Sequence, residues 1–279
     1  MNNLIRTLVF NKEISLTVAD TTEIVNEAIR LHKLSPSTAK VLGRALSAMV
    51  YMSACLKEER GEISLSVKGD GACPTLGISG NRALRIRGYI ENPHSTEPEE
   101  ACWGDNGALT IIRDDGYNRP FVGTCELLSG SVDASFEQYY AISEQLPTRL
   151  ETEVELDENG NCRFAGIVAL QALPFASSDS LQSVVETDAE AILQDLKNKG
   201  VEECIKAHFQ ADDEVWEARF ASYKCNCSKA YLSRVLVSLG EEELRKIIEE
   251  DGSVKVHCHY CSKDYEFTSE DADKLFPRG

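Results

Sequence analysis

The alternation of apolar and polar residues predicts a set of strands in the first 174 residues. Residues 63–67 and 84–89 alternate with a period of two, which is typical of a strand with one buried face. The turn signal Gly69-Asp70-Gly71 follows the first of these strands, and Asp157-Glu158-Asn159-Gly160 predicts a hairpin turn. Further strands are expected at residues 4–10, 14–18, 109–112, 121–125, 152–156 and 164–170.

Helical spacing of apolar residues predicts helices after Thr21 and over residues 131–146. Another helix begins at Ser35-Pro36, an N-cap followed by proline at the first helical position. This helix is apolar on most faces, so we expect it to be buried, although such a helix could instead form a partner surface. Hairpins combined with a few long helices indicate an α+β fold with an antiparallel-type sheet for the core domain, residues 1–174.

Residues 175–224 differ from this core because they hold eleven acidic and only five basic residues. Apolar positions from Leu181 to Leu196 predict one amphipathic helix, and residues 201–209 predict another. Short isolated helices are only marginally stable in water, so such a linker must dock on a neighbour. We therefore interpret it as a candidate movable linker, while a pair of helices fixed on the core fits the sequence equally well.

The remaining residues, 225–279, predict a small terminal domain. Helices are expected over residues 228–239 and 241–250, the second one closed by Gly252. Strands are expected at residues 254–256 and 265–267, followed by a last helix that Ser269 caps.

Four of the ten cysteines lie in this terminal domain as two close pairs, Cys225/Cys227 and Cys258/Cys261. Zn²⁺ prefers four tetrahedral ligands, and cysteine thiolates suit it. The C-x-x-C pair in a hairpin turn is a familiar half-site, whereas C-x-C is tighter than the usual spacing. Together the four cysteines predict a zinc site that holds the terminal domain together.

Two other interpretations fit these residues less well. His257 and His259 are possible ligands, but they bracket Cys258, and one strand would have to direct both neighbours at one ion. A thioredoxin-like C-x-x-C should open a helix after a strand, whereas strand signals lie on both sides of this one. Cysteine ligation of zinc is therefore preferred.

Zinc would dominate the stability of such a small domain. A structural zinc ion supplies ~10–16 kcal/mol of apparent folding free energy, as much as the whole stability of a typical domain, ~5–15 kcal/mol. An oxidised thiolate becomes a sulfenic acid, which a nearby thiol can convert to a disulfide, and the spacing within each pair permits one. We therefore expect oxidation to release the ion and to unfold the domain.

The other six cysteines stand alone and are interpreted as small buried residues of a reducing compartment; they are Cys55, Cys73, Cys102, Cys125, Cys162 and Cys204. The formal charge of −17 disfavours nucleic acid as a partner. The longest uncharged apolar stretch, residues 45–56, is too short for a bilayer, and no secretory signal opens the chain. A cytoplasmic protein without a membrane partner is expected.

Several segments resemble one known family. They are Cys225-Asn226-Cys227-Ser228, residues 239–244 (LGEEEL), residues 249–252 (EEDG), the Cys258/Cys261 pair, Gly69-Asp70-Gly71, Arg87-Gly88-Tyr89, residues 140–145 (YAISEQ) and residues 171–174 (QALP). With these segments the chain resembles the 33-kilodalton heat-shock protein family, the redox-regulated chaperonins of the bacterial cytoplasm. Ser262 departs from the family, which commonly has glycine there.

The resemblance implies one zinc ion per chain, held by Cys225, Cys227, Cys258 and Cys261 in the reduced form. It implies two neighbouring disulfides on oxidation, Cys225–Cys227 and Cys258–Cys261. It further implies that the linker unfolds, that the oxidised chain forms a homodimer, and that this form binds unfolding client proteins.

The hypothesis is therefore an ATP-independent holdase that oxidation switches on, and not an enzyme; no nucleotide-binding Gly-Lys-Ser/Thr loop is present. One alternative is a binding module with a structural zinc site that contacts RNA. Its charge opposes this, since residues 225–279 hold eight basic and eleven acidic residues. The other alternative is a thiol–disulfide oxidoreductase, although the positive surroundings that lower a thiol pKa are not evident beside Cys258.

Overall fold

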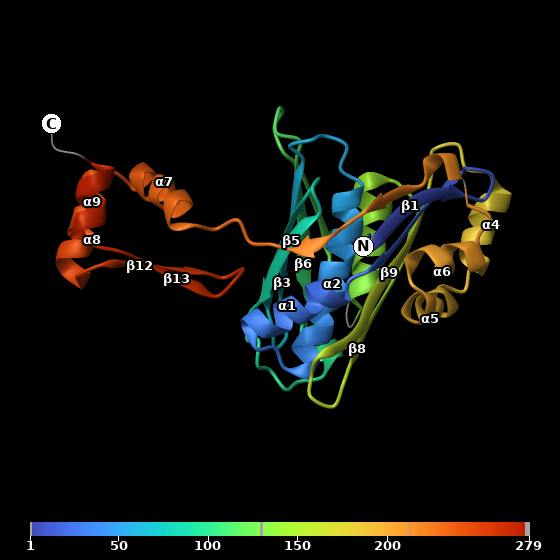
Figure 1. Cartoon of the computed structure of the whole chain (residues 1–279), viewed down its shortest axis with the longest axis horizontal. Helices are drawn as coiled ribbons and strands as arrows, with labels where there is room; N and C mark the ends of the chain where they lie inside the picture. Colours follow the sequence, from blue (N-terminus) through green and yellow to red (C-terminus); the bar gives the residue numbers. More distant parts are fainter. Residues whose placement is uncertain (1, 129–130, 212, 277–279) are drawn as a thin grey trace. The chain divides into compact units, whose positions relative to one another are not determined.

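A computed structural model describes residues 2–128, 131–211 and 213–276 of the chain, and the predicted α+β fold is confirmed (Figure 1). The strands are β1 (Leu4–Val9), β2 (Ile14–Asp20), β3 (Glu62–Gly69), β4 (Thr75–Asn81), β5 (Arg85–Ile90), β6 (Gly107–Asp114), β7 (Phe121–Glu126), β8 (Thr148–Leu156), β9 (Cys162–Ala172), β10 (Glu217–Arg219), β11 (Ser222–Tyr223), β12 (Val254–Cys258) and β13 (Lys263–Phe267). The helices are α1 (Thr22–His32), α2 (Pro36–Ala54), α3 (Val132–Tyr139), α4 (Ser178–Glu186), α5 (Ala189–Lys199), α6 (Val201–His208), α7 (Lys229–Leu239), α8 (Glu241–Asp251) and α9 (Ser269–Leu275), with short turns η1 (Glu99–Ala101), η2 (Tyr140–Glu144) and η3 (Asp213–Val215).

The described residues divide into two compact units, Met1–Lys224 and Cys225–Gly279. In the first unit the strands form two sheets, in the orders β11-β5-β4-β3-β6-β7 and β10-β1-β2-β9-β8. All neighbours in these sheets are antiparallel except β11 and β5, which run parallel. Among the described helices, none combines the length and apolar character that a helix crossing a bilayer needs.

Helix α2 lies between the two sheets of the first unit (Figure 1). The Oγ of Ser35 accepts the N–H of Thr38, as the N-cap signal predicts. Nearly the whole helix is buried, and its side chains share one apolar core with residues of both sheets. The interpretation of this helix as a core helix is therefore confirmed, because a helix covered by two sheets needs apolar residues all around.

Strand β4 was missed in the sequence because two of its seven residues are glycines, which weaken a strand signal. The tertiary structure requires one of them. A Cβ on Gly80 would lie 2.1 Å from the Ser53 Oγ of α2, so this strand passes too close to the central helix for a side chain. Close packing on α2 requires glycine in this strand. Because glycine has no side chain, the strand lacks the apolar–polar alternation by which strands are recognised in a sequence.

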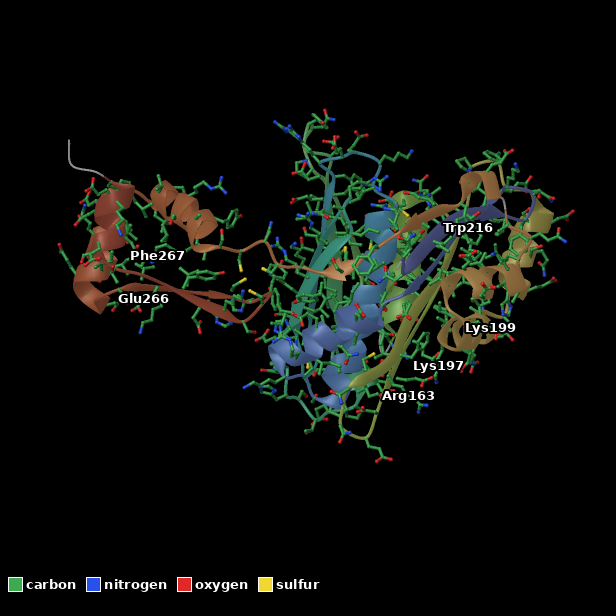
Figure 2. The ribbon with its side chains drawn as sticks, in the orientation of Figure 1. Arg163, Lys197, Lys199, Trp216, Glu266 and Phe267 are labelled. Atoms are coloured by element: carbon green, nitrogen blue, oxygen red, sulfur yellow. The ribbon has the colours of Figure 1, made fainter. Side chains whose placement is uncertain are left out.

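The acidic segment 175–224 belongs to the first unit and covers the outer face of the second sheet. Apolar residues of α5 and α6, among them Leu196 and Ile205, pack on Leu16 of β2 and Val168 of β9. Lys197 of α5 also binds Glu155 of β8, with 2.6 Å between Nζ and Oε1 (Figure 2). With helices on both faces, β2 is buried on both sides, which explains its nearly continuous burial.

The expectation of one helix from Leu181 to Leu196 is wrong, because α4 and α5 are separated at Thr187 and Asp188. The Asp188 carboxylate accepts the N–H of Ala191 at 3.0 Å and thereby begins a new helix. The guanidinium of Arg149 donates to the carbonyls of Val184, Val185 and Thr187 at 2.8–3.0 Å, which satisfies the end of α4. This arginine is distant in sequence, so the helix periodicity alone contains no sign of the break.

The end of the same segment joins both sheets, which the sequence did not predict. Strand β10 pairs with β1, and β11 pairs with β5. Both strands are very short, two and three residues, and therefore carry no recognisable alternation.

The second unit contains α7, α8, the β12–β13 hairpin and α9 around a small core. Its buried apolar residues are Leu236, Leu244, Ile248, Phe267 and Ala272 (Figure 2 labels Phe267). The last helix is present, but it begins at Ser269, and Thr268 rather than the expected Ser269 is its N-cap. Thr268 and Asp271 form a reciprocal capping box, which makes Thr268 the better cap.

Candidate metal centre

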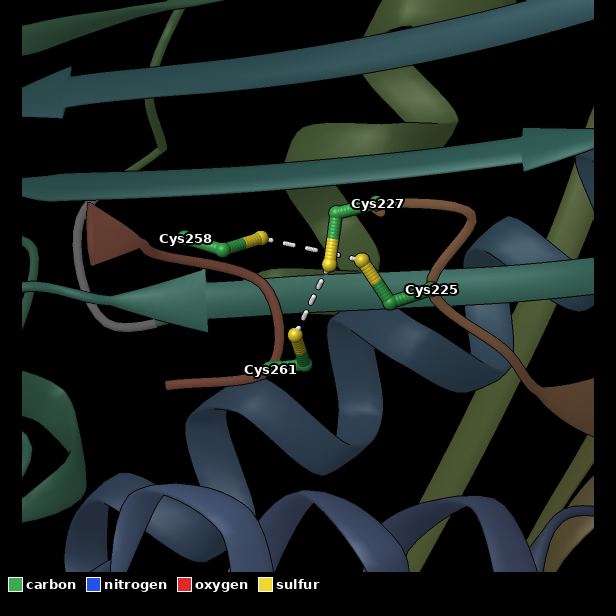
Figure 3. A group of neighbouring side chains, drawn as sticks. All are labelled: Cys225, Cys227, Cys258 and Cys261. Carbon is green, nitrogen blue, oxygen red and sulfur yellow. Dashed lines mark hydrogen bonds between the residues drawn. The ribbon is translucent and has the colours of Figure 1, made fainter. Parts of the chain in front are cut away.

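The four cysteines of the second unit come from two segments that the fold brings together (Figure 3). Cys225 and Cys227 precede α7, whose first turn is capped by the Ser228 Oγ accepting the N–H of Tyr231 at 3.1 Å. Cys258 is the last residue of β12, and Cys261 lies in the turn that leads into β13. The cap and the hairpin thus place one pair of thiols opposite the other.

The geometry of the thiols suits a tetrahedral ion. All four sulfur atoms lie within 4.8 Å of one another, with 3.7 Å between Cys225 and Cys258 and 3.2 Å between Cys227 and Cys261 (Figure 3). A tetrahedron with Zn–S bonds of about 2.3 Å has sulfur–sulfur edges of about 3.8 Å. The four cysteines therefore fit a metal ion such as Zn²⁺ with four thiolate ligands. Small movements of the sulfur atoms would complete the tetrahedron.

The turn between Cys258 and Cys261 is held by its main chain. The Cys258 carbonyl accepts the N–H of Ser262 at 2.8 Å and that of Cys261 at 3.3 Å. Ser262 has a φ of 53°, in the left-handed region that glycine occupies without strain. The serine thus occupies a position that suits glycine, at an expected penalty of about 1 kcal/mol, and the ligand set stays intact.

One thiol of the cluster has a lowered pKa. Burial acts against ionisation of Cys227, but hydrogen bonds from the Tyr265 hydroxyl, 3.1 Å away, and from the Cys261 thiol outweigh it and lower its pKa to about 7. Burial, together with donation toward Cys227, raises the pKa of Cys258 and of Cys261. The arrangement favours a first thiolate at Cys227, and thiolate is the form that binds a metal ion.

Tyr265 is the residue of this site that the sequence analysis missed. It was expected only as part of a strand, and it pairs with Val256 across the hairpin, two residues before Cys258. A tyrosine four residues after the last cysteine carries no motif of its own. Its position in the strand after the C-x-x-C turn was the only sequence feature that could have indicated a place near the cysteines.

The two histidines do not join the described thiol cluster. His257 lies opposite Asp264 in the hairpin, with 2.7 Å between Nδ1 and Oδ1. The ring of His259 packs on the ring of His257, with 5.3 Å between their centroids. The C-x-x-C turn itself connects two antiparallel strands and does not open a helix, unlike a thioredoxin-type motif.

The six single cysteines all belong to the first unit, where five are buried and Cys55 is half-buried. Burial raises the pKa of each of them, to about 12 for Cys102, Cys162 and Cys204. Their interpretation as small buried residues agrees with this environment. They are poor nucleophiles at neutral pH, in contrast to Cys227.

The structure thus defines a class of protein: an α+β unit with two sheets around a helix, followed by a small unit whose four thiols could hold a metal ion. The family model described as Hsp33 protein matches residues 2–268. The chain belongs to the Hsp33 family, as the sequence resemblance indicated.

Relatives and a solved structure agree with this assignment. The chain is 31% identical to the 33 kDa chaperonin of Clostridium perfringens (strain SM101 / Type A), over 98% of this chain and 91% of that protein. It is 30% identical to the 33 kDa chaperonin of Bacillus licheniformis, over 99% of both. The crystal structure of the 33 kDa chaperonin of Thermotoga maritima shares the fold, with a TM-score of 0.83 and 24% identity over 98% of this chain and 97% of that one.

Proposed function

We propose that this protein is an ATP-independent chaperone that binds unfolding proteins and that oxidation of its four tail cysteines switches on. The observation that carries the proposal is the meeting of Cys225, Cys227, Cys258 and Cys261 from two distant segments, in a chain of the Hsp33 family. Holding an unfolded client lowers its free concentration and thereby its aggregation, and this needs no chemical step on the client. We therefore propose that the protein acts by binding its clients and not as an enzyme.

In the reduced protein, the four thiolates would hold one Zn²⁺ ion, which would join the segment before α7 to the β12–β13 hairpin. The apolar core of this unit contains only five buried residues among those described. Such a core is too small to stabilise the unit by itself. The four sulfurs would thus supply most of the stability of the tail.

On oxidation, a tail thiolate would attack a hydroperoxide, becoming a sulfenic acid with release of water or an alcohol. A second thiol would then displace water from the sulfenic acid and form a disulfide. We propose the neighbour pairs Cys225–Cys227 and Cys258–Cys261. Neither bond joins the two segments, so the segments would separate when the ion leaves.

The pairing matters because two short sulfur distances in the reduced cluster cross between the segments, 3.2 Å from Cys227 to Cys261 and 3.7 Å from Cys225 to Cys258. Disulfides of that kind would fasten the tail and oppose a switch. Trypsin separates the alternatives, because residues 225–229 and residues 256–263 are two different peptides. Neighbour pairing leaves each peptide internally linked, whereas cross pairing joins them.

The surface for clients would lie under the linker. If α5 and α6 undock, the outer face of the second sheet loses its cover, and apolar residues such as Leu16 and Val168 become exposed. Residues 175–224 run directly into the first tail cysteine, so we propose that unfolding of the tail extends along the chain into this linker. We propose that the active form is a homodimer of the cytoplasm, with neither nucleic acid nor membrane as its partner.

The test compares reduced and peroxide-treated protein while a heat-denaturing client is followed by light scattering. We expect protection only by the oxidised form, with zinc release and loss of four thiols following the same time course. A Cys125→Ser variant serves as the control, because it changes a buried cysteine outside the tail and should keep the switch. Equal protection by both forms would contradict the proposal.

One observation favours a second candidate, a thiol–disulfide oxidoreductase: the pKa of Cys227 lies at about 7, near ambient pH. Catalytic turnover in insulin reduction would support it. We expect no turnover, because the four thiols would be used together to hold one ion.

A further inference from the structure

Two cysteines outside the tail also lie side by side. Cys73 and Cys102 are both fully buried in the first unit, and the N–H of Cys73 donates to the carbonyl of Cys102 at 2.7 Å. One main-chain hydrogen bond between two residues keeps their Cα atoms close, on the order of the ~4.4–6.8 Å that disulfides span. The backbone thus satisfies the first requirement for a covalent bond between these residues.

The Gly69-Asp70-Gly71 turn holds the two segments together. A Cβ on Gly71 would lie 2.4 Å from the carbonyl oxygen of Ala101, so the backbones are packed directly on each other. The Asp70 carboxylate accepts the N–H groups of Asp105 and Asn106 at 3.0 and 3.1 Å. It also accepts the side-chain amide of Asn106 at 2.8 Å. The turn therefore fixes the segment that carries Cys102 beside Cys73.

Both thiols are buried against main-chain carbonyls of the segment 92–98. The Sγ of Cys73 lies 3.8 Å from the carbonyl of Asn92, and that of Cys102 lies 3.6 Å from the carbonyl of Pro98. The thiols are close enough for each to shift the pKa of the other. A bond between them would require each Sγ to turn away from its carbonyl partner toward the other.

We propose that Cys73 and Cys102 form a third disulfide when the protein is oxidised, which locks the segment of residues 92–106 onto the turn. One thiolate would attack a hydroperoxide, giving a sulfenic acid and water or an alcohol, and the other thiol would displace water to form the S–S bond. The pair loses two hydrogen atoms in total, and the peroxide is reduced. The bond would constrain the unfolded chain and thereby stabilise the first unit while the tail opens.

The pair should react later than the tail. Burial raises the pKa of both thiols, that of Cys102 to about 12, so little thiolate exists at neutral pH. An ion pair between Arg44 of α2 and Glu99, with 2.9 Å between Nε and Oε1, also keeps the segment closed. Warming would open the segment transiently, so we expect this disulfide under combined heat and oxidant.

The experiment is disulfide mapping of the full-length protein after peroxide treatment at increasing temperature, with alkylation of the remaining thiols. Trypsin places Cys73 alone on residues 69–82 and Cys102 alone on residues 88–113. We expect these two peptides to become linked at elevated temperature, after the tail peptides 225–229 and 256–263 have lost their free thiols. The tail peptides report on the proposed switch in the same digest, so the failure of one proposal is distinguishable from the failure of the other.

Alkylated Cys73 and Cys102 even at the highest temperature of the series, with the tail fully oxidised, would overturn the proposal, and so would a bond from either residue to another cysteine. Two variants show whether the disulfide stabilises the first unit or has no effect on its stability. In Cys73→Ala and Cys102→Ala, oxidation should no longer raise the melting temperature of the first unit, whereas Cys125→Ala should behave as the parent. An equal rise in all three variants would contradict the lock. Since the mapping uses the unaltered chain, its result does not depend on how the variants fold.

Discussion

Tyr265 shows how one hydroxyl group acts on the tail cluster. It lies 3.1 Å from the Sγ of Cys227 and joins the hairpin to the segment before α7. Groups that hydrogen-bond to a metal ligand orient it and change its affinity, often by 10–100-fold. The hydroxyl therefore belongs to the site although it is not a ligand.

We expect Tyr265→Phe to weaken zinc binding by about tenfold and to speed its loss to a chelator, because the Cys227 thiolate loses a donor. Competition with a chromophoric chelator measures both. Tyr231→Phe is the matched control, since Tyr231 lies half-exposed on α7. Unchanged affinity in Tyr265→Phe would show that the hydroxyl has no role in the site.

Asp133 gives a pH dependence that belongs to the first unit. Burial raises its pKa to about 6, although it accepts two hydrogen bonds from Thr152 and lies 3.9 Å from Arg44. The folded protein therefore holds this proton more tightly than the unfolded chain does. Its contribution to stability is largest below about pH 4 and falls as the pH rises toward 6.

We expect Asp133→Asn to remove this dependence, which amounts to about 2–3 kcal/mol of unfolding free energy between pH 4 and 6. Denaturant unfolding of the first unit at a series of pH values measures it. The parent should lose stability relative to the variant as the pH rises through this window. Parallel curves for the two proteins would contradict the expected effect of burial.

At the scale of elements, the linker helices differ in how they are held. Helices α5 and α6 bury an apolar face on the second sheet, whereas Val185 of α4 is 70% exposed. The start of α4 is held by Ser177, which donates to the Glu13 carboxylate, and its end by the guanidinium of Arg149, which donates to three carbonyls. Hydrogen bonds to a charged group contribute about 1.5–3 kcal/mol each at most, and less where they share one donor group.

We expect Arg149→Gln to loosen α4 and leave α5 in place. Hydrogen exchange should accelerate roughly tenfold or more over residues 178–187, because the helix end loses its donors. Arg163→Gln is the matched control, as Arg163 is an exposed arginine on the neighbouring strand β9 (Figure 2). If exchange in α4 is unchanged, the apolar contacts of this helix are sufficient without the arginine.

At the scale of the whole molecule, the two units differ in what stabilises them. The first unit has two sheets, a central helix and extensive apolar cores. The second unit has five buried apolar residues among those described, and four thiols at one end. Their responses to metal removal should therefore differ.

Chelation of a zinc-loaded sample should unfold the second unit and leave the first unit folded. The expected loss is about 10–16 kcal/mol of apparent folding free energy for the tail. Hydrogen exchange resolved by residue measures both units in one sample, and re-addition of zinc should restore the tail. A tail that stays protected after chelation would show that its apolar core suffices.

The local signals that the structure confirms share one property: they are complete within a few residues. Ser35-Pro36 begins α2, and the Asp157–Gly160 turn joins two paired strands. The four cysteines could be grouped because each pair is close in sequence. Their ligation of zinc and their pairing on oxidation remain predictions.

What the sequence by itself determined is thus the fold class, the buried central helix, and a tail with four thiols in two pairs, since period and spacing are local properties. Only the tertiary structure decided the glycine-bearing strand β4, the break that Arg149 produces between α4 and α5, and the partners Tyr265 and Cys102. Each of these depends on a contact between residues far apart in the chain. Local periodicity tells which face of an element is covered, but not which residue covers it.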